Sequence, residues 1–218
     1  MRPWESRMST SSAMASMAAA ASGARDVPGV FKACGAKPKC GRCFEEAARF
    51  LAEWNDAALP REGHILDLMA GPVTRIPTAS RHVVGLGINP EELHANPTLT
   101  ESVVHDVNLE PRLPFDDAVF DGALCSAAVQ YLVHPLDTFC EVARVLKPGA
   151  PFIVAFTTRM YAEKAVLAWR TSDDAAHERL VRTYFEQCTA FGDVRVERHE
   201  AEAGLPVWWL HATAREAT

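Results

Sequence analysis

The chain has 218 residues, of which 48% are hydrophobic, which suffices for one domain with a substantial core and an extension but not for two complete domains. Its 22 Lys and Arg residues stand against 28 Asp and Glu residues, and this net charge of −6 disfavours a nucleic-acid partner. The most apolar stretches, such as Ala123 to Val133, are far shorter than the ~20 residues that span a bilayer, so we expect a soluble protein with no membrane partner.

The N-terminal residues differ in composition from the rest of the chain. Residues 1–42 begin with a stretch rich in Ser, Ala and Met that lacks apolar periodicity, and we expect an extension outside the main core. An acid-poor leader of this kind is similar to a transit peptide, which would direct the protein to a chloroplast or another organelle. The alternatives are a disordered tail on a cytoplasmic protein, or a start codon assigned too early, with Met8, Met14 or Met17 as the first residue.

The six cysteines favour a reducing compartment. Cys125, Cys140 and Cys188 lie in apolar periodic segments, where a free cysteine acts as a small hydrophobic residue. Cys40 and Cys43 have the spacing of a redox or zinc half-site, but no second pair and no paired His follows at zinc-finger spacing. We therefore interpret this motif as a loop with incidental thiols, and we expect no metal site.

From Cys43 onward, apolar residues recur at helical spacing and predict a helix over residues 43–56 that leads a domain of residues 43–218. Short apolar runs then alternate with helical patterns. The expected strands are residues 64–69, 81–86, 102–106, 120–125 and 151–156, and the expected helices are residues 135–146, 160–169 and 177–188. Residues 194–198 and 207–212 are expected to pair antiparallel at one edge of the sheet.

This alternation predicts an α/β fold in a single domain. The expected architecture is a doubly wound, mostly parallel, Rossmann-like sheet of seven strands with an antiparallel edge hairpin. In such sheets the ligand binds beyond the carboxyl ends of the strands. We therefore expect the site in the loops that follow Met69, Leu86, Asp106 and Cys125.

Two motifs are specific enough to indicate a family. Residues 113–121 read L-P-F-D-D-A-V-F-D and residues 144–149 read R-V-L-K-P-G. Together with Ile65-Leu66-Asp67-Leu68 and Val83-Val84-Gly85, they resemble the class I S-adenosylmethionine-dependent methyltransferases of type 11 over residues 65–213. Residues 96–101, 106–109 and 156–160 further resemble an uncharacterised branch found in plants, algae and cyanobacteria. The resemblance implies S-adenosylmethionine as the cofactor and a small-molecule methyl acceptor.

The cofactor positions that the resemblance implies lack two of the family's usual groups. The glycine-rich G-x-G-x-G loop reads Met69-Ala70-Gly71-Pro72-Val73 here, and we expect the helix after it to be stunted. The family's ribose-binding acid is replaced by Gly87, with Asn89 as a neutral substitute, and we expect Gly87 to tolerate Asp if its loop lies at the surface. The expected cofactor-binding residues are Asp67, Met69, Gly71, Gly87, Asn89, Asp106, Val107 and Ser126.

Two acids among these positions have alternative interpretations. The resemblance makes Asp106 an acceptor for the adenine amino group, beside the backbone N–H of Val107. Asp106 could instead form a turn ahead of Asn108. Asp67 could likewise close its loop through hydrogen bonds to the backbone.

Methyl transfer from a sulfonium depends mostly on positioning, so the sequence need contain no catalytic triad. The acceptor-side candidates follow the fourth and fifth strands and are His134 as a general base, Tyr131, and Arg159 as a ligand for a carboxylate. His134 could instead be a solvated residue before a helix, and Arg159 a helix cap. We expect an enzyme, and the alternative is a non-catalytic, methyltransferase-like binding or scaffold protein with a degenerate cofactor loop.

Overall fold

The computed structural model describes residues 52–76, 81–201 and 205–215. The expected N-terminal extension, the motif at Cys40 and Cys43, and most of the helix expected over residues 43–56 lie outside these ranges. The described end of that helix comprises residues 52–58. Within the described ranges, no helix has the length and apolar character needed to cross a membrane.

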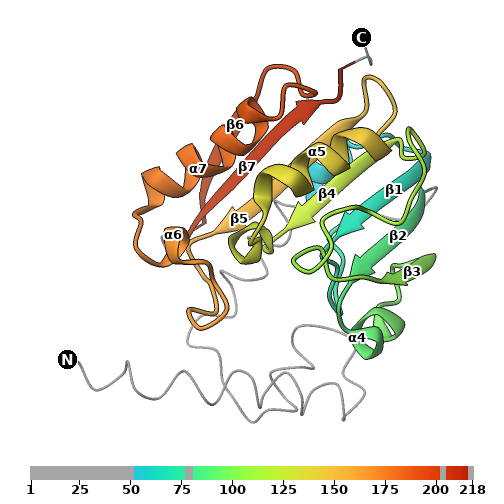
Figure 1. Cartoon of the computed structure of the whole chain (residues 1–218), viewed down its shortest axis with the longest axis horizontal. Helices are drawn as coiled ribbons and strands as arrows, with labels where there is room; N and C mark the ends of the chain where they lie inside the picture. Colours follow the sequence, from blue (N-terminus) through green and yellow to red (C-terminus); the bar gives the residue numbers. More distant parts are fainter. Residues whose placement is uncertain (1–51, 77–80, 202–204, 216–218) are drawn as a thin grey trace.

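Seven strands form one mixed sheet in the order β3-β2-β1-β4-β5-β7-β6 (Figure 1). The strands are β1 (Gly63–Leu68), β2 (Arg81–Gly87), β3 (Glu101–Val104), β4 (Gly122–Ser126), β5 (Pro151–Thr157), β6 (Arg195–Ala201) and β7 (Leu205–Thr213). The first five pair in parallel, whereas β7 pairs antiparallel with both β5 and β6. The order reverses between β1 and β4, and the doubly wound sheet with an antiparallel edge pair is confirmed.

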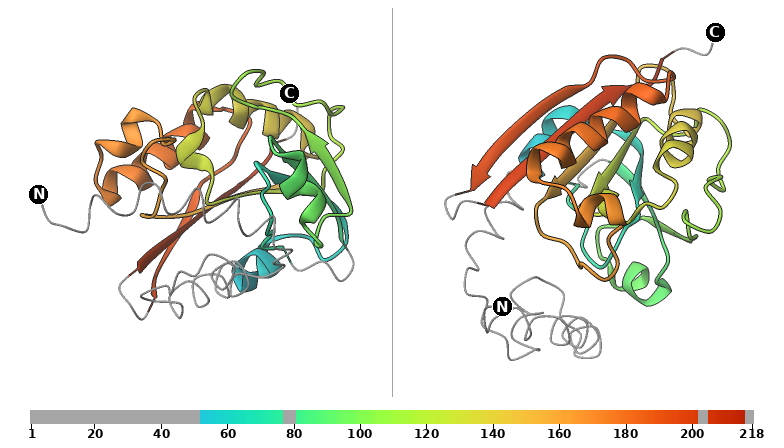
Figure 2. Two further views of the ribbon diagram at one scale, coloured as in Figure 1. Left: turned by 90° about the horizontal axis from the view of Figure 1, so that it is seen from below. Right: turned by 60° about the vertical axis from the view of Figure 1, so that its left-hand side comes forward.

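Helices cover both faces of this sheet. Besides the helical residues 52–58, they are α4 (Pro90–Ala95), the short 3-10 helix η1 (Val129–Tyr131), α5 (Pro135–Val145), α6 (Leu167–Arg170) and α7 (Asp174–Gln187). Helices α5 and α7 lie on one face and residues 52–58 lie on the other (Figure 2). Helices α4 and η1 are not among the elements expected from the sequence.

The prediction of a helix over residues 160–169 is wrong for most of that range, because α6 begins only at Leu167. The backbone N–H of Tyr161 donates to the hydroxyl of Tyr131 at 2.9 Å, and the backbone N–H of Val166 donates to the carbonyl of Gln130 at 3.1 Å. These two N–H groups therefore bind to residues of the loop after β4 and do not take part in a helix that spans residues 160–169. The segment after β5 is tied down by tertiary contacts in place of a helix.

The parallel strands at the centre of the sheet are buried on both faces. Leu66 and Val154 pack in the cluster beneath α5 and α7, where the ring of Phe139 lies 5.1 Å from that of Phe152. Their neighbours in sequence, including Ile65, pack in a second cluster on the opposite face. Since side chains alternate between faces, a shift of one residue would exchange the two clusters, and this fixes the register.

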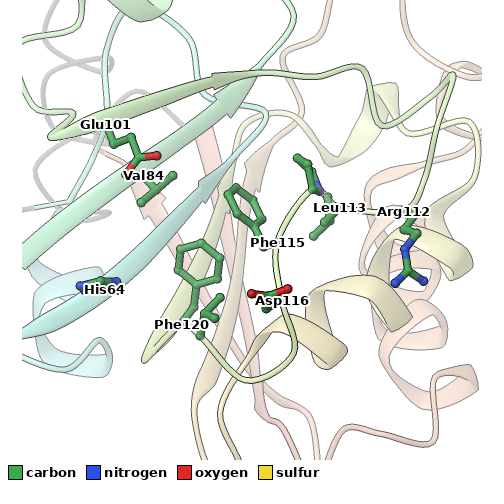
Figure 3. A pocket seen from close by; sticks show the side chains of 10 residues that line it. His64, Val84, Glu101, Arg112, Leu113, Phe115, Asp116 and Phe120 are labelled. Atoms are coloured by element: carbon green, nitrogen blue, oxygen red, sulfur yellow. The ribbon is translucent and has the colours of Figure 1, made fainter.

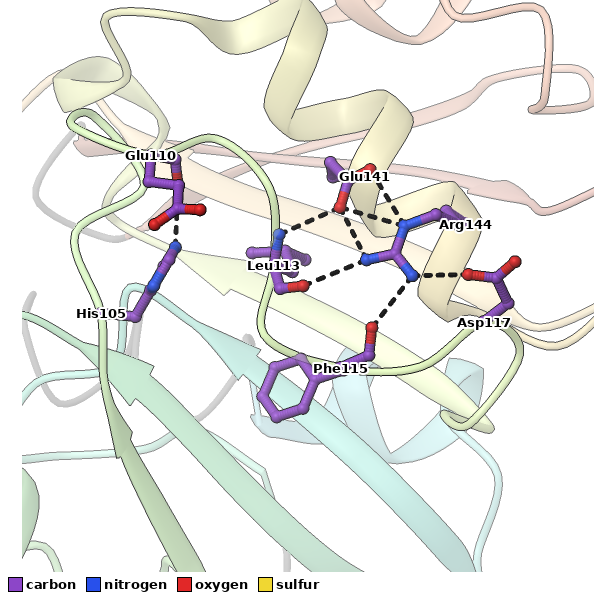
Figure 4. Close-up of polar contacts among 7 residues, drawn as sticks. All are labelled: His105, Glu110, Leu113, Phe115, Asp117, Glu141 and Arg144. Carbon is purple, nitrogen blue, oxygen red and sulfur yellow. Dashed lines mark hydrogen bonds and ion pairs between the residues drawn. The ribbon is translucent and has the colours of Figure 1, made fainter.

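The two family-specific motifs contact each other through Arg144 on α5 (Figure 4). Its guanidinium donates to the carbonyls of Leu113 at 3.1 Å and Phe115 at 2.9 Å, and to the carboxylates of Asp117 at 2.6 Å and Glu141 at 2.7 Å. Glu141 also accepts from the backbone N–H of Leu113 at 3.0 Å. Hydrogen bonds from Arg144 lower the pKa of Glu141. This arrangement fastens the long β3–β4 loop, residues 105–121, which contains no helix.

We expect Arg144→Lys to lower the free energy of unfolding by about 2–3 kcal/mol, because an ammonium cannot satisfy the acceptors that the planar guanidinium reaches. Urea denaturation measures this loss. The matched control is Arg182→Lys, which should cost less than about 0.5 kcal/mol, because among the described residues Arg182 makes only a 3.6 Å ion pair with Glu178, and both side chains are partly exposed. Equal losses in the two variants would mean that other contacts hold the loop.

Candidate functional site

Five loops meet at the carboxyl ends of the parallel strands, on the side of the sheet where α4 and α6 lie (Figure 1). They follow β1 to β5, and every cofactor and acceptor residue expected from the sequence lies either in one of them or in the last two residues of a strand that leads into one. The strand order reverses between β1 and β4, and a sheet of this topology binds its ligand at that reversal. The candidate site is therefore this edge of the sheet.

The residues that follow β1 and β4 both have a left-handed backbone. Three non-glycine residues of the described ranges have positive φ, namely Met69 at 57°, Ala118 at 55° and Ala127 at 56°. A side chain in this conformation costs about 1–2 kcal/mol, and such strain concentrates at functional sites. By the resemblance noted above, Met69 stands where methyltransferases have the first glycine of the loop. The backbone there keeps the left-handed conformation that favours glycine, although the residue is Met. Two of the three strained residues flank the reversal of the sheet.

Side chains hold the loop after β1 in place. The Thr74 hydroxyl donates to Oδ2 of Asp67 at 2.5 Å, and Nδ2 of Asn96 donates to Thr74 at 2.9 Å and to the carbonyl of Gly71 at 2.8 Å. Asp67 and Asn96 are each 4% exposed, so these bonds lie in the interior. Residues 69–76, the described part of this connection, contain no helix, as expected for a stunted one.

Burial raises the pKa of Asp67 to about 7, against the opposing effects of the Thr74 hydrogen bond and the charge of Arg75. The pKa of Asp67 in the unfolded chain is near 3.9. A raised pKa means that folding favours the protonated carboxyl, so the stabilisation is complete below about pH 4 and is lost as the pH rises through about 7. Asp67 thus makes the domain less stable at alkaline pH.

Asp67→Asn keeps an acceptor for Thr74 but cannot titrate. Between pH 4 and pH 8, we expect the unfolding free energy of the parent to fall by roughly 2–4 kcal/mol relative to this variant. Urea denaturation of both proteins at several pH values gives the difference, in which the other titrating groups cancel. Parallel pH profiles would show that Asp67 does not titrate in this range.

Gly87 lies in a close contact between two backbones. A Cβ atom at this position would overlap the carbonyl oxygen of Ala70, whose own N–H donates to the carbonyl of Leu86 at 2.8 Å. The expectation that Gly87 would tolerate Asp is therefore wrong, because the loop after β1 covers the end of β2. Glycine here permits the close approach of two chains. Gly71 differs, because a Cβ there would meet only a carboxylate oxygen of Glu92, at 3.7 Å.

We expect Gly87→Ala to lower the free energy of unfolding by about 1–3 kcal/mol, because the loop after β1 must shift to admit a methyl group. Gly71→Ala is the matched control in the same loop. It should be neutral or stabilising by up to about 1 kcal/mol, since it has room for a methyl group and restricts the unfolded chain. Chemical denaturation of both variants measures the difference, and a neutral Gly87→Ala would show that the two segments separate easily.

Two residues expected to bind the cofactor also make local hydrogen bonds. Oδ1 of Asn89 caps α4 by accepting from the N–H groups of Glu91 at 3.0 Å and Glu92 at 3.3 Å. Oδ1 of Asp106 accepts from the N–H of Asn108 at 2.9 Å, which is the turn considered as its alternative. One oxygen of each side chain is therefore used by the fold, which leaves Nδ2 of Asn89 and Oδ2 of Asp106 as the atoms that could face a ligand.

Asn108 has a structural role that was not expected from the sequence. Its Nδ2 donates to the carbonyl of Tyr131 at 3.0 Å, and its Oδ1 accepts from the N–H of Val133 at 2.8 Å. Asn108 thereby ties the loop after β3 to the loop after β4. Its position two residues after Asp106 is the only signal in the sequence, and spacing alone does not name its partners.

Two polar oxygens, one at the end of β4 and one in the loop after it, are buried without a hydrogen-bond partner in the described part of the chain. They are Oγ of Ser126 and Oε1 of Gln130, whose amide nitrogen donates to the carbonyl of Ala127 at 2.9 Å. Unpaired buried oxygens are rare in folded proteins and mark places where a ligand or water completes the bonding. A polar ligand at this edge fits these atoms. The described residues contain no group of His, Cys, Asp or Glu able to hold a metal ion.

The acceptor-side candidates lie in two loops that contact each other. The hydroxyl of Tyr131 accepts from the N–H of Tyr161, and the two rings lie 6.5 Å apart between centroids. Burial raises the pKa of Tyr131, so the phenol is neutral at physiological pH. His134 is exposed at the start of α5, where its side chain makes no capping bond. Arg159 is exposed in the loop after β5.

A cavity of about 470 Å³ lies away from this edge, between the amino-terminal halves of β1 to β3 and the loop of residues 112–120 (Figure 3). Val84, Phe115 and Phe120 form its apolar wall, and the two rings meet edge to face at 4.9 Å between centroids. None of the residues expected to bind the cofactor or the acceptor lines it. The cavity is therefore separate from the candidate site.

Residues 63–154 match the family model described as a methyltransferase domain. The chain is 32% identical over 139 residues to the biotin biosynthesis bifunctional protein BioHC of Teredinibacter turnerae. The matched segment covers 63% of this chain and 21% of that protein. It is 30% identical over 112 residues to the methyltransferase phqN of Penicillium fellutanum, and this second match covers 49% of this chain and 32% of that protein. The chain thus spans between a fifth and a third of the length of these curated relatives.

Solved methyltransferases share the fold at low identity. An S-adenosylmethionine-dependent methyltransferase of Thermotoga maritima superposes with a TM-score of 0.57 at 15% identity, over 78% of this chain and 90% of that chain. The seven-stranded sheet, with its antiparallel edge pair, accounts for this likeness. Residues 63–154 are therefore similar to a methyltransferase domain, and the sheet has the fold of solved S-adenosylmethionine-dependent methyltransferases.

Proposed function

We propose that the protein transfers a methyl group from S-adenosylmethionine to a small-molecule acceptor. The observation that carries this proposal is the pair of buried, unpartnered oxygens of Ser126 and Gln130, among the described residues, beside the left-handed Ala127 at the carboxyl end of β4. A fold that leaves such atoms unpaired at the ligand edge of its sheet is suited to a polar ligand there. The match to a methyltransferase domain over residues 63–154 supports this cofactor.

Residues at the carboxyl ends of four strands would hold the cofactor. They are Asp67 in β1 with Met69 and Gly71 after it, Gly87 at the end of β2 with Asn89 after it, Asp106 and Val107 after β3, and Ser126 at the end of β4. S-adenosylmethionine supplies an electrophilic methyl group on a sulfonium. At the ribose position Asn89 would offer a neutral amide where the family has a carboxylate, and a neutral hydrogen bond contributes about 1 kcal/mol less than a charged one. We therefore expect binding to be roughly fivefold to tenfold weaker than a carboxylate would give.

The acceptor would lie against the loops after β4 and β5. Tyr131 would position it as a neutral phenol, since the hydroxyl of Tyr131 is held by the N–H of Tyr161. The guanidinium of Arg159 suits an acceptor that carries a carboxylate, and His134 would remove its proton. The net charge of −6 favours a small molecule over a nucleic acid, whose phosphates the protein would repel.

Isothermal titration with S-adenosylmethionine and S-adenosylhomocysteine tests the cofactor assignment. Asp106→Asn keeps Oδ1 for the turn with Asn108 but replaces the second carboxylate oxygen with an amide donor that cannot accept from the adenine amino group. We expect the dissociation constant to rise about tenfold or more, with Tm changed by no more than a degree or two. Asp116→Asn is the matched control, since Asp116 is exposed and lines the separate cavity.

The outcomes separate the two candidate functions. Unchanged affinity in Asp106→Asn would make Asp106 a turn residue only. If the parent binds neither compound, the second candidate gains, namely a non-catalytic binding or scaffold protein. The observation that favours this second candidate is the loop after β1, where Met69 and Val73 replace two glycines of the family's pattern.

A further inference from the structure

Two cysteines from separate helices meet at the seam between α5 and α7. Cys140 belongs to α5 and Cys188 is the residue that ends α7, and their Sγ atoms lie 2.7 Å apart. Beside them the ring of Phe139 lies 5.6 Å from that of Tyr184 and 4.9 Å from that of Phe185. Packed aromatic side chains on both helices therefore hold the two sulfurs next to each other.

The two thiols differ in access to solvent. Cys188 is 2% exposed, as the sequence suggested for a small hydrophobic residue, but Cys140 is exposed and that expectation is wrong for it. Cys125 is fully buried within the sheet and is out of reach of a reagent in solution. Of the cysteines in the described ranges, one is accessible and lies against a buried partner, which is an arrangement suited to a two-step thiol exchange.

We propose that Cys140 and Cys188 form a redox-sensitive dithiol, which closes to an intramolecular disulfide when the protein meets a small-molecule disulfide such as oxidised glutathione. The Sγ atoms need to approach by only ~0.7 Å to reach the bonded distance of about 2.05 Å. Side-chain rotation of Cys140, which is not confined by packing on its exposed side, supplies this movement. The proposal does not depend on methyl transfer.

The reaction balances as two thiol–disulfide exchanges. The thiolate of Cys140 attacks one sulfur of oxidised glutathione, which forms a mixed disulfide and releases one glutathione thiolate. The thiolate of Cys188 then attacks Sγ of Cys140, which forms the protein disulfide and releases the second glutathione thiolate. The protein loses two protons and two electrons, and the electrons reduce one molecule of oxidised glutathione to two of glutathione.

The surroundings of Cys188 predict how the second step depends on pH. Burial raises the pKa of the Cys188 thiol to about 12, so its thiolate is scarce at neutral pH. We therefore expect the exposed Cys140 to meet the oxidant first, and closure of the disulfide to become faster as the pH rises toward about 9. A mixed disulfide on Cys140 should accumulate at lower pH before the second exchange occurs.

The test uses the full chain, incubated with oxidised glutathione, then blocked with an alkylating reagent and mapped by mass spectrometry. Cleavage after Lys and Arg together with cleavage before Asp yields residues 137–144 and 183–192, each of which contains one cysteine. This digestion separates Cys140 from Cys125, which share one peptide after cleavage at Lys and Arg alone. We expect the two peptides to be joined, at a mass lower than their sum by two hydrogen atoms, and to separate on treatment with dithiothreitol.

Thermal unfolding gives a second readout, because a cross-link between residues 48 apart in sequence restricts the unfolded chain. We expect oxidation to raise Tm by roughly 5–15 °C in the parent and to leave Tm unchanged in Cys140→Ser. Cys140 is exposed, so this variant should fold as the parent does. The matched control is Cys125→Ala, which should keep the full oxidation-dependent rise in Tm.

Two results would overturn the proposal. One is glutathione that stays on Cys140 at pH 9 without any joined peptide, which would mean that Cys188 cannot reach it. The other is an oxidation-dependent rise in Tm that persists in Cys140→Ser, which would assign the effect to other cysteines of the chain, such as Cys34, Cys40 or Cys43.

Discussion

Burial of the central strands on both faces is the constraint on which the rest of the structure depends. Because Leu66 and Ile65 must enter separate clusters, the register of β1 against its neighbours cannot shift. That register aligns the carboxyl ends of β1, β4 and β5 at one edge. The loops that emerge there are consequently close in space, although residues 69 and 161 are far apart in sequence.

Hydrogen bonds between loops take over where the fold lacks regular elements. The connection after β1 is held by Thr74 and Asn96, and the long β3–β4 loop is held by Arg144 and Asn108. Each of these side chains pairs with at least one partly buried group of another segment, and leaving such a group without a partner is costly. The degenerate glycine loop is therefore an ordered part of the domain, and its left-handed Met69 is maintained by the packing around it.

Helix α5 connects the candidate site with the dithiol. It begins directly after His134, carries Arg144 near its carboxyl end, and presents Cys140 to α7 from a position between these two residues. Contacts at the α5–α7 seam and contacts at the ligand edge thus involve one rigid element. A cross-link there would act on the support of the loop after β4 and not on the residues that would touch the cofactor.

The sequence by itself determined the alternation of strands and helices, the edge pair and the likeness to a methyltransferase domain, because periodic burial and the L-P-F-D-D and R-V-L-K-P-G motifs are local properties of the chain. It also predicted which loops would lie together, since parallel strands end at one edge. Only the tertiary structure decided that Gly87 contacts Ala70 and that Cys140 meets Cys188. It also decided that Asn89 and Asp106 each use one side-chain oxygen in a hydrogen bond to the backbone. It likewise replaced most of the helix expected over residues 160–169 with contacts to the loop after β4. The reason is that these features depend on contacts between segments that are distant in sequence. Periodicity and motif spacing are local, and they do not indicate which distant segments come into contact.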